Sequence, residues 1–251
     1  MPRYFADMMY NGTRYHGWQV QPGQKTVQGE LESRLQQLFG PETAIVGSGR
    51  TDTGVHALQQ YFHVDLPSPV DGNTLCYKLN SMLPGDIAIR RIFPVAEDTH
   101  ARFSATRRAY VYQISPVKDA FMEDRAWHLH QPLDLEAMNA AAAVLLQKTD
   151  FKSFSKVKTE VNHFECTIFH AQWERKNDLI VFNVSANRFL RGMVRALVGT
   201  LTQIGLGKMP PEAFEAIIDA QDRKAAGANA PPQGLFLTEV HYPEGLLTTN
   251  A

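Results

Sequence analysis

The stretch Gly47-Ser48-Gly49-Arg50-Thr51-Asp52-Thr53-Gly54-Val55-His56-Ala57 places three glycines, one arginine and one aspartate between two apolar, strand-prone runs. Glycine permits positive φ angles and lets another backbone or a ligand approach closely. A strand that ends in such a loop presents one short side chain rigidly, and the candidate is Asp52. A carboxylate near the guanidinium of Arg50 stays ionised, which suits a nucleophile better than a general acid.

Strands and helices alternate on both sides of this loop. Apolar periodicity predicts strands at residues 3–10, 43–46, 58–66 and 86–95. It predicts one helix that begins after Thr26 and ends before Gly40, and a second at residues 73–83. The order strand-helix-strand-strand-helix-strand is the ferredoxin-like arrangement, a sheet with two helices on one face.

The second half of the chain shows a similar mixture with an extra helix and insertions. We predict strands at residues 107–116, 165–173, 179–184 and 235–242, and a short strand or loop at 127–129. Helices are expected after Asp134 and at residues 188–206 and 211–220. The expected fold class is therefore α+β, with domains at residues 1–105 and 106–251. Two similar halves would form a cleft between them.

Composition limits the class of protein and its location. The chain has 251 residues, of which 44% are hydrophobic, so a folded core is expected. It has no run of 18 apolar residues, and Asp7 falls early in the N-terminal segment, so we expect neither a membrane span nor a secretory leader. Two distant cysteines predict free thiols in a cytoplasmic protein, with no cysteine metal site. The net charge is −1, so nucleic-acid binding would depend on locally clustered basic residues.

Several common catalytic motifs are missing from the sequence. It contains no P-loop, no G-x-G-x-x-G, no H-E-x-x-H and no G-x-S-x-G. Asp52-Thr53-Gly54 matches the turn of aspartic proteases, but that chemistry needs two carboxylates that share a proton. The chain has no second such turn, and Arg50 would oppose proton sharing. The isolated histidines at positions 16, 63, 100 and 128 are read as structural.

Further strings along the chain agree with the loop. His100-Ala101-Arg102-Phe103-Ser104-Ala105 precedes Arg108-Ala109-Tyr110-Val111-Tyr112, and residues 189–199 read Phe-Leu-Arg-Gly-Met-Val-Arg-Ala-Leu-Val-Gly. With residues 47–57, 80–87 and 234–237, these strings resemble the tRNA pseudouridine synthase A family (TruA type), in the family's order and over nearly the whole chain. The resemblance implies a pseudouridine synthase fold, in which two ferredoxin-like halves form a continuous, mostly antiparallel sheet with a central cleft.

The same resemblance implies an activity. It would be an isomerase without cofactor or metal that converts uridine to pseudouridine at positions 38, 39 and 40 of the tRNA anticodon stem-loop. A homodimer in which one tRNA contacts both subunits is also implied. The alternative is a catalytically silent RNA-binding protein on the same scaffold. The joint presence of Asp52, Tyr110 and Arg195 argues against that alternative.

The family's functional residues fall on named positions of this sequence. Asp52 takes the nucleophile's position, where it adds to uracil C6 or assists departure from ribose C1′. Tyr110 takes the position of the tyrosine that packs on the uracil, and Arg195 that of the arginine paired with the aspartate. Arg50 takes a position suited to displacing or supporting a flipped nucleotide, and Leu237 would line the pocket. Candidate phosphate contacts are Arg102, Arg107, Arg108, Lys156, Lys158, Arg188 and Arg191.

Overall fold

The structure, a computed structural model, describes residues 1–156 and 163–247 of the chain. The chain divides into a first unit, Met1–Arg107 with Leu237–Ala251, and a second unit, Arg108–Phe236. Strand pairing is mixed and mostly antiparallel, and both units carry helices. The predicted α+β class is therefore confirmed. That two ferredoxin-like halves repeat around a central cleft stays a prediction.

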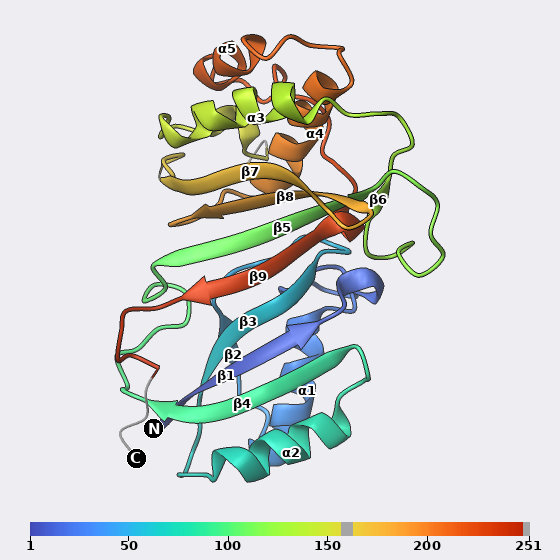
Figure 1. The fold of residues 1–251 in the computed structure, drawn as a ribbon. Helices are drawn as coiled ribbons and strands as arrows, with labels where there is room; N and C mark the ends of the chain where they lie inside the picture. Colours follow the sequence, from blue (N-terminus) through green and yellow to red (C-terminus); the bar gives the residue numbers. More distant parts are fainter. Residues whose placement is uncertain (157–162, 248–251) are drawn as a thin grey trace. The chain divides into compact units, whose positions relative to one another are not determined.

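The first unit contains strands and helices in the predicted order. Its elements are β1 (Arg3–Tyr10), α1 (Val27–Phe39), β2 (Ile45–Gly47), β3 (His56–Asp65), α2 (Gly72–Met82) and β4 (Ile87–Val95), with most of β9 (Leu235–His241). Strand β1 runs antiparallel to β3 and β4, and β2 runs antiparallel to β3. Helices α1 and α2 lie beside each other on one side of these strands (Figure 1), and Arg34 Nε of α1 donates to the Met82 carbonyl of α2 at 3.1 Å.

Local sequence signals explain the boundaries of α1. The Thr26 side chain accepts a hydrogen bond from the Gly29 amide at 3.2 Å, as expected of an N-cap. Gly40 ends the helix with a φ of 102°, a conformation that favours glycine. Between these ends, Val27, Leu31 and Leu35 are fully buried. Each such side chain contributes roughly 2 kcal/mol by leaving water, so the apolar stripe fixes the buried face of α1.

The second unit packs its helices against an antiparallel trio of strands. Its elements are β5 (Arg107–Ser115), β6 (Trp127–His128), α3 (Leu135–Ala143), β7 (Ile168–Lys176), β8 (Leu179–Ala186), α4 (Met193–Gly205) and α5 (Ala213–Asp219). Strand β8 is antiparallel to β5 and β7, whereas β6 is parallel to β5. The Asn139 side chain joins α3 to β7, since it accepts from the Trp173 amide and donates to the Trp173 carbonyl at 2.8 and 2.9 Å.

Helix α4 begins later than the sequence predicts. The expected helix started at Arg188, but α4 starts at Met193 because Gly192 adopts a φ of 73°. The Asn187 side chain accepts hydrogen bonds from the amides of Thr167 and Arg188 at 2.8 and 2.7 Å, which holds the preceding residues in a non-helical path. Arg188 and Arg191 therefore lie in a turn before the helix. The hydrogen bonds to Asn187 and the positive φ of Gly192 outweigh the apolar periodicity here.

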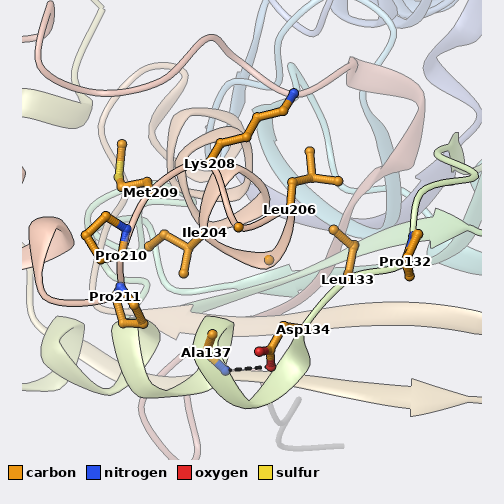
Figure 2. Close-up of a pocket in the computed structure, with 12 residues that line it drawn as sticks. Pro132, Leu133, Asp134, Ala137, Ile204, Leu206, Lys208, Met209, Pro210 and Pro211 are labelled. Carbon is orange, nitrogen blue, oxygen red and sulfur yellow. Dashed lines mark hydrogen bonds between the residues drawn. The ribbon is translucent and has the colours of Figure 1, made fainter.

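A cavity of about 700 Å³ lies in the second unit, between the start of α3 and the segment 204–211 (Figure 2). Its lining includes Leu133, Asp134, Leu206 and Lys208, and Asp134 also caps α3 by accepting from the Ala137 amide at 3.0 Å. Arg195 lies near the opposite end of α4 from this cavity. Of the predicted site residues that the structure describes, none lines it.

Among the described residues, none of the helices is both long and apolar enough to span a membrane.

Candidate functional site

Asp52 lies in a well-anchored turn between β2 and β3 of the first unit. Its carbonyl accepts a hydrogen bond from the Val55 amide at 3.1 Å, and the preceding Thr51 hydroxyl pairs with the buried Tyr10 hydroxyl at 2.8 Å. Asp52 itself is half-buried, whereas Arg50 is exposed. The backbone of this turn is therefore fixed on both sides of the carboxylate. A half-buried carboxylate on a fixed backbone is suited to act on a bound substrate.

The segment 11–18 holds the Asp52 turn from outside. The Tyr15 carbonyl accepts from the Gly54 amide, and the Thr51 carbonyl accepts from the Trp18 amide, both at 3.2 Å. Tyr15 and Trp18 are 1% and 2% exposed. Aromatic rings in such a loop can pack on the core or offer a surface for bases. Their burial supports core packing.

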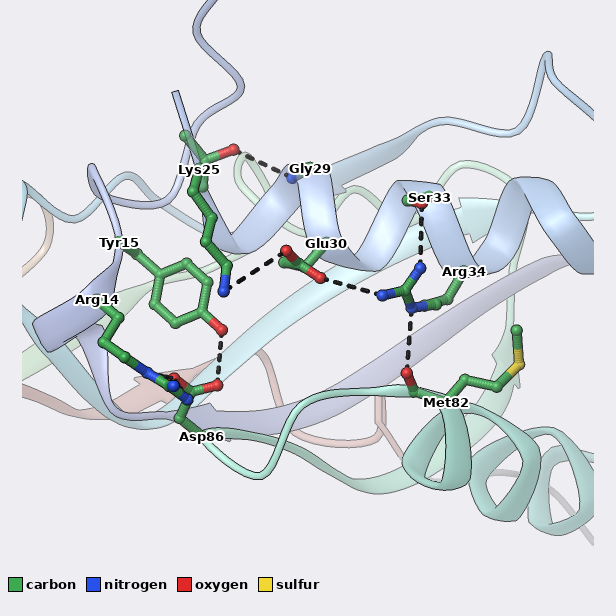
Figure 3. Close-up of polar contacts among 10 residues, drawn as sticks. Arg14, Tyr15, Lys25, Gly29, Glu30, Ser33, Arg34, Met82 and Asp86 are labelled. Carbon is green, nitrogen blue, oxygen red and sulfur yellow. Dashed lines mark hydrogen bonds and ion pairs between the residues drawn. The ribbon is translucent and has the colours of Figure 1, made fainter. Parts of the chain in front are cut away.

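A polar network anchors the segment 11–18 in turn (Figure 3). The Tyr15 hydroxyl donates to Asp86 Oδ1 at 2.6 Å, and Arg14 pairs with Asp86 Oδ2 at 2.6 Å. Burial, and then the bond to Asp86, raise the pKa of the Tyr15 hydroxyl, so it remains a donor at neutral pH. Burial opposes ionisation of Asp86, but the bonds from Tyr15 and Arg14 outweigh it and lower the pKa of this carboxyl. Sequence reasoning missed this support.

The three glycines of the turn have different roles. Gly54 has a φ of 77°, which favours glycine. A larger residue does not fit at Gly47, because a Cβ there would lie 2.5 Å from the indole ring of Trp18. Gly49 has nothing within 4 Å of its would-be Cβ. Of the three, only Gly49 therefore lacks an evident structural requirement.

This difference gives a matched pair of variants. We expect Gly47→Ala to lower the free energy of unfolding by about 1–3 kcal/mol, because Trp18 must move. Gly49→Ala should change it by less than about 0.5 kcal/mol. Urea denaturation of both variants measures the two values. Equal losses from the two substitutions would contradict this explanation of the turn.

Tyr110 and Arg195 both belong to the second unit. Tyr110 lies on β5 opposite Val184 of β8, is half-buried, and meets the Phe189 ring edge-on at a centroid distance of 5.1 Å. Arg195 is in the first turn of α4, a helix in which 11 residues are buried. A half-buried arginine on such a helix requires an explanation, since apolar helices of this kind normally bury their whole circumference.

The segment 226–231 fixes the Arg195 side chain. Arg195 Nε donates to the Ala230 carbonyl at 2.7 Å, and the Ala230 amide donates to the Arg195 carbonyl at 2.9 Å. The buried Thr200 hydroxyl accepts from the Gly227 amide at 2.9 Å, and the Tyr112 hydroxyl donates to the Pro231 carbonyl at 2.8 Å. Burial raises the pKa of Tyr112, which keeps it a donor. The Nε side of the Arg195 guanidinium is thus held against this segment.

Four of the predicted RNA-contacting residues gather within the second unit. Arg108 Nη1 donates to the Asn187 carbonyl at 3.0 Å, and the Lys156 amide donates to the Arg191 carbonyl at 3.1 Å. Arg188 directly follows Asn187 in the same turn. We call Arg108, Lys156, Arg188 and Arg191 the basic cluster. Three distant stretches of sequence therefore converge on one turn.

Comparison with known proteins gives this arrangement a family. The family model described as tRNA pseudouridine synthase matches residues 6–104 and 141–243. Relatives named tRNA pseudouridine synthase A are 46% identical in Parabacteroides distasonis and 45% in Porphyromonas gingivalis. Each match covers 98% of this chain, and 98% and 99% of the respective relative. A third, from Bacteroides fragilis, is 44% identical over 96% of this chain and 97% of its own.

The chain belongs to the tRNA pseudouridine synthase family. This confirms the predicted resemblance and the predicted enzyme class, an isomerase. The aspartic protease interpretation of Asp52-Thr53-Gly54 receives no support from these matches.

The remaining predicted residues of this tRNA pseudouridine synthase are placed as follows. Leu237 is buried at 2% exposure in the first unit, and Arg102 is exposed in a turn after β4. Arg107 is half-buried at the start of β5. Lys158 lies outside the described residues. Within residues 1–156 and 163–247, no group of three or more histidine, cysteine or acidic residues is placed to hold a metal ion.

Proposed function

We propose that this synthase isomerises uridine to pseudouridine at positions 38, 39 and 40 of the tRNA anticodon stem-loop, with Asp52 as nucleophile and no cofactor. The observation that carries the proposal is the half-buried Asp52 on a turn whose flanking backbone is held by Val55, Tyr15 and Trp18. The names of the full-length relatives support the substrate class, tRNA.

The chemistry requires one bond exchange on the base. The bond from uracil N1 to ribose C1′ breaks, and a bond from uracil C5 to C1′ forms. The C5 proton leaves to solvent, and N1 gains a proton. Asp52 either adds to C6 of the ring or acts at C1′, and in both cases an ionised carboxylate at fixed position is needed.

The other site residues are proposed to bind and orient. Arg195 pairs with Asp52 and keeps it charged and aimed when water is excluded. Tyr110 packs on the uracil, and Leu237 lines the pocket. Arg50, which is exposed beside the turn, supports the flipped nucleotide.

Substrate binding follows from the structure of RNA. A base in a stem must leave its stack before a side chain can reach it, which costs a few kcal/mol that pocket contacts offset. The basic cluster, with Arg102 and Arg107, is proposed to contact phosphates, so tRNA affinity falls as salt rises. We also propose that the enzyme is a homodimer and that it acts in the cytoplasm.

Release of tritium from tRNA that carries 5-tritiated uridine tests the reaction, because C5 loses its hydrogen. We expect the purified wild-type protein to release tritium over many turnovers without added cofactor. The alternative function is a silent RNA-binding protein. Tight tRNA binding by the wild type without any tritium release would favour that alternative.

A further inference from the structure

Three aromatic rings in the first unit, those of His63, His100 and Phe103, form an aromatic cluster that extends from the core to solvent. His63 on β3 is 5% exposed, and its ring meets His100 at a centroid distance of 4.7 Å and an angle of 70°. His100 in turn lies 4.4 Å from the Phe103 ring at 32°. Phe103 is the outermost ring of this aromatic cluster and is 76% exposed.

Hydrogen bonds to ring nitrogens of the aromatic cluster fix the turn at residues 100–103. His63 Nδ1 accepts from the Ala101 amide at 3.0 Å. His100 Nδ1 accepts from the amides of Arg102 and Phe103 at 3.0 and 3.2 Å. Burial lowers the pKa of His63 to about 4 and also lowers that of His100, so both rings are neutral acceptors at neutral pH.

Two further hydrogen bonds hold the backbone of this turn. The His100 amide donates to Ser104 Oγ at 3.0 Å, and the Tyr242 hydroxyl donates to the Ala101 carbonyl at 2.6 Å. The backbone at Phe103 is therefore held in place without any ligand. A preorganised ring loses little conformational freedom when a partner covers it.

A cation accompanies the exposed ring. The Arg102 guanidinium carbon lies 5.5 Å from the Phe103 centroid, and Arg102 is itself exposed. An aromatic ring with a guanidinium over it matches a nucleotide, because bases stack on aromatic rings and on guanidinium planes and the phosphate attracts the cation. A second protein would more often meet a broader apolar patch than one ring beside a charge.

The turn is remote from Asp52 within the same unit. The Asp52 turn precedes the first residue of β3, His56, whereas His63 lies near the end of that strand. The extended chain from His56 to His63 therefore spans roughly 23 Å. A ligand at Phe103 is therefore not the reacting nucleotide but another part of the same RNA.

We propose that Phe103 and Arg102 form a platform on which an unpaired base of tRNA stacks, away from the nucleotide that is isomerised. The inference rests on the proposed tRNA substrate. It adds a binding site that contributes affinity and not chemistry, since the platform does not touch the reacting atoms.

The test compares three variants in binding to full-length unmodified tRNA at one fixed salt concentration. Phe103→Ala should raise Kd by about tenfold, in the range found for loss of one base–aromatic contact. Phe103→Trp keeps a stacking face and should stay within about twofold of wild type. Tyr77→Ala is the matched control, because Tyr77 is 78% exposed on α2 of the same unit, and it should leave Kd unchanged. In tritium release, the defect of Phe103→Ala should appear as a raised KM for tRNA rather than a lowered kcat, whereas Tyr77→Ala should match wild type in both.

Three results would overturn the platform. One is an unchanged Kd for Phe103→Ala, and another is an equal loss of affinity for the Ala and Trp variants. The third is a change in sedimentation of Phe103→Ala without RNA, which would assign the ring to a contact between copies of the chain. These outcomes are independent of the proposed reaction. A wild type that binds tRNA but releases no tritium refutes the isomerase proposal and still leaves the Kd comparison decisive for the platform.

Discussion

Asp52→Asn is expected to abolish pseudouridine formation while the protein stays folded and binds tRNA. The amide has nearly the shape of the carboxylate but lacks its charge and nucleophilicity. The turn is held through the Asp52 carbonyl and through Thr51 and Gly54, and the substitution leaves these contacts in place. Loss of a nucleophile lowers kcat by about 10⁴-fold or more. We therefore expect no tritium release above background.

The control for this variant lies in the same turn. Thr53 is exposed and directly follows Asp52, so Thr53→Ala should keep wild-type tritium release. Circular dichroism and a tRNA Kd for both variants separate chemistry from folding and binding. Release by Asp52→Asn at a rate near that of Thr53→Ala would remove Asp52 from the nucleophile's role.

Arg195→Ala is expected to lower kcat by about 10²- to 10³-fold, the cost typical of losing one preorganised charge partner. It also removes the bond from Nε to the Ala230 carbonyl, so some stability is lost, by about 1–3 kcal/mol. Single-turnover tritium release at saturating tRNA measures the catalytic part. Added guanidinium salt should restore part of the rate if the missing charge is the cause.

Thr200→Val separates the two effects of Arg195→Ala. It removes the acceptor for the Gly227 amide and so loosens the segment 226–231, but leaves the arginine in place. We expect a similar loss of stability with a much smaller loss of kcat. Equal kcat losses in the two variants would mean that Arg195 acts only by holding this segment.

Local signals in the sequence predicted much of the fold. The helices expected after Thr26 and after Asp134 begin where predicted, because each start depends on a cap within one turn of it. The strand-helix order of the first unit followed from such signals. The start of α4 did not, because the turn at Asn187 depends on Thr167, 20 residues away.

The candidate site, like the fold, was predictable only where local motifs determine it. Asp52, Tyr110 and Arg195 are candidates because they lie in motifs that resemble a family, and their roles stay predictions. Their supports were not found, because they join distant residues. Tyr15 binds Asp86, 71 residues away, and Arg195 binds Ala230, 35 residues away. Gly17, whose φ of 85° brings it against the Thr51 carbonyl, was the local signal that could have indicated the support of the Asp52 turn.

Mapping pseudouridine at single-nucleotide resolution tests the proposed reaction and its positions directly. The purified protein would be incubated with unmodified tRNA transcripts that carry uridine at positions 38, 39 and 40, with Asp52→Asn in parallel. We expect pseudouridine at those positions with the wild-type protein and uridine throughout with the variant. Pseudouridine only at other positions, or the same pattern from both proteins, would contradict the proposal.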